Sequence, residues 1–174
     1  MAESSNDFGL LEGVGAEAIG QPGQRTFRLI ARSSNASASL WMEKEQLNAL
    51  GTAIQQQIVR LGRPASRERP VPLINAGDIP QSPDVEFHLG QIGLGFDETK
   101  DEFVVIAYPV DPEETTESGW TGQLTLAQAR SLSREIERVV NAGRPRCPLC
   151  GLLIEGATHN CPRANGNAKE FASG

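Results

Sequence analysis

The residues with the clearest chemical potential are three cysteines and one of the two histidines, which lie together near the C-terminus. Cys147, Cys150, His159 and Cys161 form the pattern C-x2-C-x8-H-x-C. Two thiolates separated by two residues can chelate one tetrahedral ion, and the imidazole and the third thiolate bring the set to four ligands. The sequence therefore predicts one structural Zn²⁺ ion bound by these four side chains, with no open coordination position for a substrate.

Three other interpretations of the cysteines stay open. Cys147 and Cys150 have the spacing of a redox pair, although such a pair usually begins a helix and this one follows a predicted helix end. An iron–sulfur cluster could use the same four ligands, but it is less common than zinc at a turn of this kind. The cysteines could also be buried without any ion.

The cysteine segment has too few apolar residues to fold by burial alone, so the binding of a metal, worth about 10 kcal/mol, would stabilise it. The rest of the 174-residue chain, with 39% apolar and 22% charged residues overall, has ordinary globular composition. It has no run of about eighteen apolar residues and no basic, apolar leader. We therefore expect a cytoplasmic protein without a membrane partner.

The charge distribution suggests where partners could bind. The formal net charge of −6 argues against bulk binding to phosphate backbones or anionic lipid. Residues 84–117 hold ten acidic residues and one lysine. In contrast, Arg130, Arg134 and Arg138 recur every fourth residue, so on a helix they would form one basic stripe.

The sequence indicates a contact surface for a protein partner. This surface would combine the first predicted hairpin, from Gln21 to Arg25, with the arginines beside the cysteines, namely Arg144, Arg146 and Arg163. These polar and basic groups would cluster next to a rigid metal site.

Two similar halves precede the cysteine segment. Each contains a strand led by an aromatic residue, a polar turn, a second short strand and a helical stretch ending in Gly-Arg-Pro, at 62–64 and at 143–145. A further strand with glycines precedes each set, around 13–20 and 85–96. The sequence therefore predicts an α+β fold in which two β-β-β-α repeats form an antiparallel sheet with two packed helices, plus a C-terminal zinc knuckle.

The expected domain organisation follows from this repeat and from a proline-rich stretch between the halves. The predicted segments are a duplicated domain (7–145, halves about 8–64 and 84–145, linker 65–83), a zinc knuckle (146–166) and disordered ends (1–6 and 167–174).

The two helices are predicted from their apolar periodicity. Leu47, Leu50 and Ile54 step by three and four and so share one face of the first helix. The second helix has the same pattern and begins with a capping box, Thr125 with Gln128. Each helix is expected to end at the glycine of its Gly-Arg-Pro sequence.

Two strands carry specific predictions. Apolar residues occupy odd positions from Val85 to Leu89 and even positions from Ile92 onward, so an extra residue at Gly90-Gln91 would form a bulge. The segment 103–107 is continuously apolar, which predicts a central strand that is buried on both faces.

The remaining candidates for chemistry have simpler structural interpretations. His88 lies on the polar phase of its strand and is interpreted as a lone surface residue. The acidic pairs at 97/98, 101/102 and 113/114 are interpreted as turn and edge charges. Several glycines lack the context of a phosphate loop and are attributed to bulges and close backbone approaches, namely those at 13, 15, 20, 90, 93 and 95.

Four segments, GQPGQRTF (20–27), EKEQ (43–46), GRPRCPLCG (143–151) and HNCPRANG (159–166), resemble a bacterial family of unknown function. It is catalogued as domain of unknown function 3090 and is found mainly in actinobacteria and Chloroflexi. The resemblance covers nearly the whole chain, and the cysteine segment is its most specific part. It implies the domain boundaries and the metal site but no reaction.

The function predicted from the sequence is that of a non-catalytic, zinc-binding interaction or adaptor protein rather than an enzyme. The alternative is a nucleic-acid-binding protein that uses the arginine stripe and the knuckle. A third possibility is an enzyme with its active site in a groove between the halves, but no cluster of titratable residues with a recognisable spacing supports it.

Overall fold

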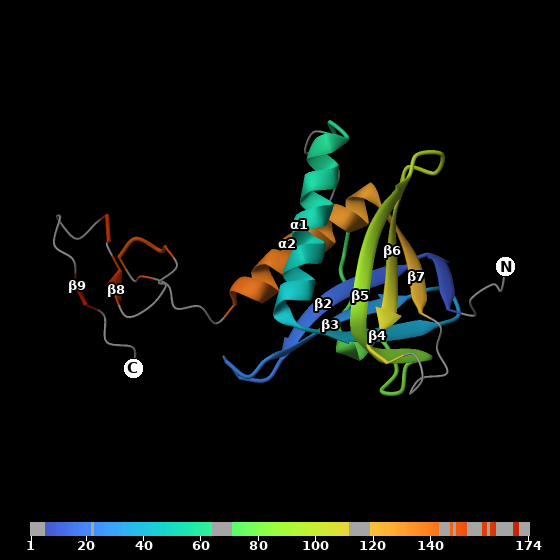
Figure 1. The fold of residues 1–174 in the computed structure, drawn as a ribbon, viewed down its shortest axis with the longest axis horizontal. Coiled ribbons are helices and arrows are strands. Elements are labelled where there is room, and N and C mark those ends of the chain that lie inside the picture. The colour runs from blue at the N-terminus through green and yellow to red at the C-terminus, as the bar shows by residue number, and fades with distance from the viewer. Residues whose placement is uncertain are drawn as a thin grey trace. The chain divides into compact units, whose positions relative to one another are not determined.

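The computed structural model describes residues 6–21, 23–63, 71–111, 119–142, 147, 149–152, 158–159, 161–162 and 169–170. The chain forms two compact units, Met1–Val140 and Asn141–Gly174. The first unit holds a large sheet and two α-helices (Figure 1). The second holds the cysteines.

The first unit confirms the predicted α+β class. Its elements are β1 (Asp7–Leu10), β2 (Gly13–Ile19), β3 (Thr26–Arg32), β4 (Ser37–Met42), α1 (Lys44–Arg60), the 3₁₀ helix η1 (Ala76–Asp78), β5 (Val85–Asp97), β6 (Glu102–Pro109), β7 (Trp120–Thr125) and α2 (Leu126–Asn141). After β1, the order β-β-β-α occurs twice. That the two halves arose by duplication stays a prediction.

The sheet is mixed, whereas the sequence analysis expected an antiparallel one. Its seven strands have the order β1-β7-β6-β5-β4-β3-β2. β2, β3 and β4 form one antiparallel meander, and β5, β6 and β7 form another. The crossover through α1 joins the two meanders by a parallel pair, β4 with β5. The second parallel pair joins β1 to β7.

The bulge predicted in β5 is confirmed. The register with β6 shifts between Leu89 and Gln91, and the buried positions change phase there. The expectation that 103–107 is buried on both faces is wrong, because Val104 and Ile106 in β6 are only half-buried. Both α-helices pack on the opposite face of the sheet, so these two side chains have no helix above them (Figure 1).

The start of both α-helices and the end of α1 follow the predicted local signals, whereas the predicted end of the second helix at Gly143 lies outside the described residues. In α2, the backbone N–H of Gln128 donates to Thr125 Oγ1 at 3.1 Å, and the Thr125 N–H donates to Gln128 Oε1 at 2.9 Å. α1 begins after Glu43, whose N–H donates to the side chain of Gln46. Gly62 ends α1 with a φ of +64°, a conformation that suits glycine.

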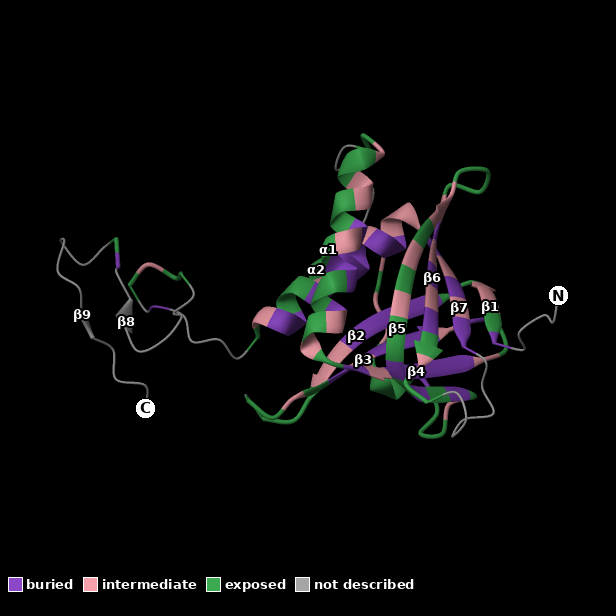
Figure 2. Ribbon diagram, in the orientation of Figure 1, coloured by how far each residue is buried: buried purple, intermediate pink, exposed green. Residues whose placement is uncertain are grey.

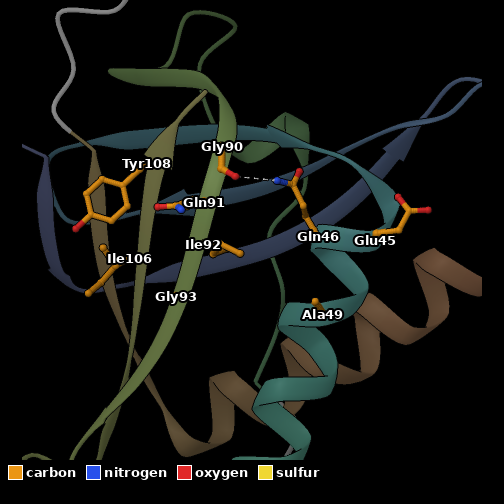
Figure 3. Close-up of a pocket in the computed structure, with 9 residues that line it drawn as sticks. All are labelled: Glu45, Gln46, Ala49, Gly90, Gln91, Ile92, Gly93, Ile106 and Tyr108. Atoms are coloured by element: carbon orange, nitrogen blue, oxygen red, sulfur yellow. Dashed lines mark hydrogen bonds between the residues drawn. The ribbon is translucent and has the colours of Figure 1, made fainter. Parts of the chain in front are cut away.

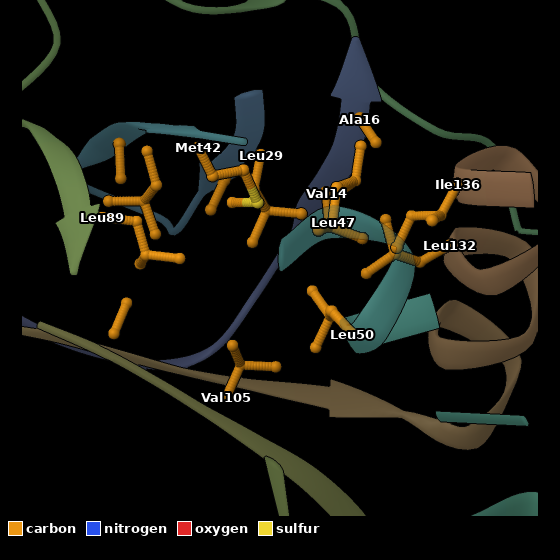
Figure 4. Packing of buried hydrophobic residues seen from close by; sticks show 14 of the residues in the cluster. Val14, Ala16, Leu29, Met42, Leu47, Leu50, Leu89, Val105, Leu132 and Ile136 are labelled. Atoms are coloured by element: carbon orange, nitrogen blue, oxygen red, sulfur yellow. The ribbon is translucent and has the colours of Figure 1, made fainter. Parts of the chain in front are cut away.

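One apolar core joins both helices to one face of the sheet (Figures 2 and 4). Leu47, Leu50 and Ile54 of α1 and Leu132 and Ile136 of α2 are each at most 3% exposed. They share this core with inward residues of both meanders. The core thus packs the two halves into one unit.

The N-terminal strand β1 is held at the far edge of the sheet. Phe8 packs edge-on against Trp120, with ring centroids 5.6 Å apart. Asn6 was expected to fall in a disordered segment, but it is buried and its side chain donates to the carbonyl of Gly119 at 2.8 Å. Ordered structure therefore extends to the residue before β1.

The segment between the halves is packed against the sheet along part of its length. The N–H of Ile74 donates to the carbonyl of Val14 in β2 at 3.1 Å. A Cβ atom at Gly15 would lie 2.0 Å from the Ile74 carbonyl oxygen, so only glycine permits this contact. Ile79 is also buried. Part of the predicted linker, from 71 to 79, is therefore a structural element of the first unit.

The second unit contains a short sheet of β8 (Thr158–His159) and β9 (Lys169–Glu170), which pair antiparallel. β9 lies within the segment 167–174 that was expected to be disordered. Within the described residues of both units, no helix has the length and the apolar character that a bilayer crossing requires.

Candidate metal centre

A tight turn brings the first two cysteines toward each other. The N–H of Gly151 donates to the carbonyl of Cys147 at 2.9 Å, and the N–H of Cys147 donates to the carbonyl of Leu152 at 2.9 Å. Gly151 has a φ of +73°, in the left-handed region where a side chain would be strained. The glycine after Cys150 therefore has the backbone role that its position predicts.

The three thiols converge on one point. The Sγ atoms of Cys147, Cys150 and Cys161 all lie within 4.8 Å of one another. Cys147 and Cys161 are 2% and 6% exposed, and their sulfurs are 3.7 Å apart. All three are free thiols. Because 3.7 Å far exceeds a disulfide length of about 2.05 Å, Cys147 and Cys161 do not form a disulfide. The three thiols lie close enough together to hold one metal ion.

The polypeptide also favours the ionised form of Cys147. Burial alone would raise the pKa of this thiol. The backbone N–H groups of Cys150 and Leu149 and the neighbouring thiols outweigh burial by hydrogen bonding to the sulfur, so the pKa falls from its usual 9.0 to about 6. The thiolate is the form that binds a metal. At neutral pH, therefore, Cys147 is already in its ligand form.

The fourth predicted ligand, His159, is placed only through its backbone. It lies in β8, opposite Lys169 of β9, and its side chain lies outside the described part of the structure. Its role as a ligand stays a prediction. Cys161 is two positions further along the chain, so His159 is close in sequence to one of the three clustered cysteines.

The arginine stripe lies on α2, but part of it is already engaged within the first unit. Arg138 Nε donates to Glu135 at 2.9 Å, and Arg130 Nη2 donates to the carbonyl of Arg63 at 3.0 Å. Arg134 is exposed. The Glu135 carboxylate offsets the charge of Arg138, and the contact with the Arg63 carbonyl occupies one donor of Arg130 without changing its charge.

The other predicted contact residues are only partly described. The hairpin around Gln21 and Arg25 is closed by a hydrogen bond from the Gln24 N–H to the Gln21 carbonyl, and Gly23 has a φ of +90°, as expected for the predicted turn. Gln21 is exposed and Arg25 is half-buried. Three further predicted contact residues lie outside the described residues, namely Arg144, Arg146 and Arg163.

His88 is exposed on β5, as predicted, and it lies beside Trp41 of β4 with nearly parallel rings 6.5 Å apart. Arg28 of β3 lies over the same indole at 5.0 Å and pairs with Glu17 of β2 at 2.9 Å. The contacts thus form a ladder of side chains across four strands. The ladder lies on the face of the sheet opposite the two α-helices, and the sequence periodicity did not predict it.

The acidic residues of the β5–β6 turn have the predicted structural role. Asp97 Oδ1 accepts from the Thr99 hydroxyl and from the N–H groups of Thr99 and Lys100. These hydrogen bonds lower the pKa of Asp97, with the Thr99 hydroxyl having the largest effect. Asp101 pairs with Arg63 at 2.8 Å. These carboxylates stabilise a turn and do not form an acid–base pair.

The expected groove between the halves is present as an open cavity of about 550 Å³ (Figure 3). α1 of the first half forms one wall, and β5 and β6 of the second half form the other. Of the described side chains that line the cavity, Glu45 and Tyr108 are the ones that can titrate.

The fold and the thiols define an α+β protein with a mixed sheet and a candidate metal centre in a separate C-terminal unit. A family model described as "Protein of unknown function (DUF3090)" matches residues 6–161, which include all three cysteines and His159. The chain belongs to this family. No curated protein and no solved structure matches the chain.

Proposed function

We propose that the chain is a non-catalytic, zinc-binding interaction protein whose C-terminal unit is held together by one Zn²⁺ ion. The convergence of three thiol sulfurs within 4.8 Å carries the proposal. A tetrahedral Zn²⁺ ion with Zn–S bonds of about 2.3 Å separates its sulfur ligands by about 3.8 Å. The Cys147–Cys161 separation of 3.7 Å agrees with that value.

The site is structural in this proposal because the protein supplies all four ligands. His159 joins the three thiolates and leaves no position for a water molecule or a substrate. The buried cluster described in the second unit consists of Cys147 and Cys161, with Cys150 packed against them. In this proposal, metal binding supplies the stabilisation that an apolar core would otherwise give, since the described residues of this unit bury little besides the cysteines.

The interaction role is supported by side chains that surround the thiols. Leu149 is 45% exposed and Leu152 is 53% exposed, although both are large and apolar. Exposed apolar groups beside a rigid site are typical of a protein contact surface. The arginines at 144, 146 and 163 lie close to the cysteines in sequence, so we include them in the proposed surface. The partner in this proposal is another protein.

Metal analysis tests the zinc site. Wild type should bind one equivalent of zinc, and Cys150→Ser should lose it, because two thiolates and an imidazole bind far more weakly. His159→Gln should lower the affinity by at least about tenfold. Leu149→Ala is the matched control, since it changes the same turn without removing a ligand. A Cys150→Ser protein that retains stoichiometric zinc would contradict the proposal.

A capture experiment tests the interaction surface. Zinc-loaded wild type and a Leu149→Asp variant, each cross-linked in a cell extract, should differ in one or a few specific partners. The double variant Arg146→Glu with Arg163→Glu should lose the same partners. Recovery of identical partners by all three proteins would rule out this surface. Nucleic acid bound at low salt and lost in Arg134→Glu would support the alternative function instead.

A further inference from the structure

Half of β5 has an unpaired edge. β4 pairs with β5 only from Val85 to His88, whereas β6 pairs with β5 as far as Asp97. Beyond the bulge, therefore, no strand in the described part of the chain pairs with β5 on its β4 side. An unpaired edge presents backbone N–H and C=O groups at every second residue, and these groups can bind another extended chain.

The side chain of Gln46 closes only one end of this edge. Its amide nitrogen donates to the carbonyls of Leu89 and Gly90, at 3.3 Å each. The free edge therefore begins at Gln91. From Gln91 to Phe96, every second residue is exposed and the residues between are half-buried, and Asp97 is half-buried as well.

The described residues give no steric reason for glycine at two positions on this edge, Gly93 and Gly95. A Cβ atom at Gly93 would meet nothing within 4 Å, and one at Gly95 would meet only Val104, at 4.0 Å. Neither glycine has a positive φ. The close-approach explanation holds for Gly90, where a Cβ atom would lie 2.9 Å from the Pro109 carbonyl oxygen. It is wrong for Gly93 and Gly95.

Glycine weakens a strand, and in a strand interior it often marks a place where another backbone or a ligand approaches closely. The described residues leave the space beside Gly93 empty and nearly empty beside Gly95, so a group of another molecule has room to approach there. A large side chain on a neighbouring strand can also cover a strand glycine. Both effects indicate an added strand with bulky residues opposite these two glycines.

The cavity lies along this same edge. In Figure 3, Ile92 points toward α1 and Ala49, whereas Ile106 and Tyr108 lie on the other side of β5. An extended peptide placed along the edge would direct successive side chains to these two sides alternately. Both sides offer apolar surface to it, and Tyr108 is 49% exposed.

Acidic groups flank the edge at both ends. Glu45 of α1 lines the cavity beside this edge, and Asp97 and Glu98 lie at the far end of the edge. These charges favour a partner with basic groups. They disfavour a second copy of this chain, because self-pairing would bring the acidic groups of the two copies to the same edge.

We infer that the β5 edge from Gln91 to Asp97 binds an extended basic peptide as an added strand, with large apolar or aromatic side chains opposite Gly93 and Gly95. The inference rests on the interaction role proposed above but not on the metal. The bound segment pairs with the β5 backbone, which gives affinity, and its bulky residues cover the glycines, which gives specificity.

An array of synthetic, end-capped heptapeptides tests this site on the full-length protein. Each peptide carries lysine at both ends, two apolar or aromatic residues two positions apart, and threonine elsewhere. Aromatic members should bind best, measured by fluorescence anisotropy. Each peptide that binds is also made in two N-methylated forms, one with methyl groups on the odd-numbered amides and one with methyl groups on the even-numbered amides. Only one of the two forms should lose binding, because only the amides that face β5 donate hydrogen bonds to the edge.

A glycine replacement provides the specificity test. Gly93→Val should fold normally, because the space is empty and valine suits strands. It should lower the affinity for aromatic peptides at least about tenfold, and peptides with alanine at the position that faces residue 93 should then bind better than those with an aromatic residue there. Ile19→Thr, at an exposed position of β2, is the control and should change nothing. Glu45→Lys should weaken basic peptides, most clearly at low salt.

Several outcomes would overturn the inference. The first is that no peptide of the array binds wild type more tightly than it binds Gly93→Val. The second is that N-methylation of either set of amides weakens binding equally. The third is that wild type sediments as a dimer and Gly93→Val as a monomer. The last would assign the edge to a second copy. Cys150→Ser should bind peptide like wild type, so loss of zinc with peptide binding retained separates failure of the metal centre from failure of this site.

Discussion

Cys147 illustrates how hydrogen bonds to a single atom can prepare a metal site before the metal arrives. Its backbone neighbours lower the pKa of the thiol to about 6, although burial opposes that change. Because the folded pKa lies below the usual 9.0, ionised Cys147 stabilises the fold at alkaline pH. This stabilisation is lost as the pH falls from about 9 through about 6.

The lowered pKa predicts how many protons zinc displaces. At neutral pH, zinc binding should release one proton fewer than the number of thiol ligands, because Cys147 is already a thiolate. As the pH falls through about 6, Cys147 becomes protonated in the metal-free protein, so zinc binding should then release one proton more. Calorimetry in buffers of different ionisation enthalpy measures this number. Release of the full complement at neutral pH would show that Cys147 is protonated in the metal-free protein.

Among the elements, the contact between the two α-helices depends on one glycine. Gly51 of α1 is buried, and a Cβ atom there would lie 2.7 Å from Ile136 Cγ2 of α2. Alanine in place of a helical glycine normally stabilises a protein by about 1 kcal/mol. Here the clash dominates, since overpacking of a core costs about 1–3 kcal/mol.

Gly51→Ala should therefore lower the free energy of unfolding, by about 1 kcal/mol, against the helix-propensity trend. The neighbouring exposed position supplies a matched control, Thr52→Ala, which should be neutral or slightly stabilising. In urea unfolding, the double variant Gly51→Ala with Ile136→Ala should be less destabilised than the sum of the single variants. An additive result would mean that the helices separate without cost.

The elements also show what the sequence could predict. Helix caps and the β5 bulge depend on residues within a few positions, so Thr125 with Gln128 and the phase change at Leu89 were sufficient to predict them. The half-exposed face of β6 could not be predicted, because it depends on which face the helices cover. The unpaired edge of β5 depends on where β4 ends, which is also a tertiary property.

The candidate sites, too, have features that the sequence was sufficient to predict and features that depend on tertiary structure. The cysteine spacing was sufficient to place three thiols together, because a short turn fixes Cys147 and Cys150 and the chain returns soon after at Cys161. The role of Gly93 was misread, since a strand glycine looks the same in sequence whether or not its own chain fills the space. Only the folded structure shows that Ile74 lies against Gly15 whereas the space beside Gly93 is empty of described residues.

At the scale of the whole molecule, the two units should respond separately to metal. Chelation of zinc should make the segment after Asn141 sensitive to protease and leave the thermal transition of the first unit unchanged, because the described core of that unit contains no metal ligand. A chain that ends at Ala142 should melt at the same temperature as the full chain. Calorimetry checks both, and a lower main transition in either case would show that the units stabilise each other.

The position of β1 has a consequence for synthesis of the chain on the ribosome. Among the strands of the seven-stranded sheet, β1 is made first, but its partner β7 spans Trp120–Thr125, near the end of the first unit. The β2–β4 meander can form as soon as it emerges, whereas β1 must wait until most of the protein has been translated. The N-terminal residues therefore join the sheet last, and Phe8 reaches Trp120 only after both meanders exist.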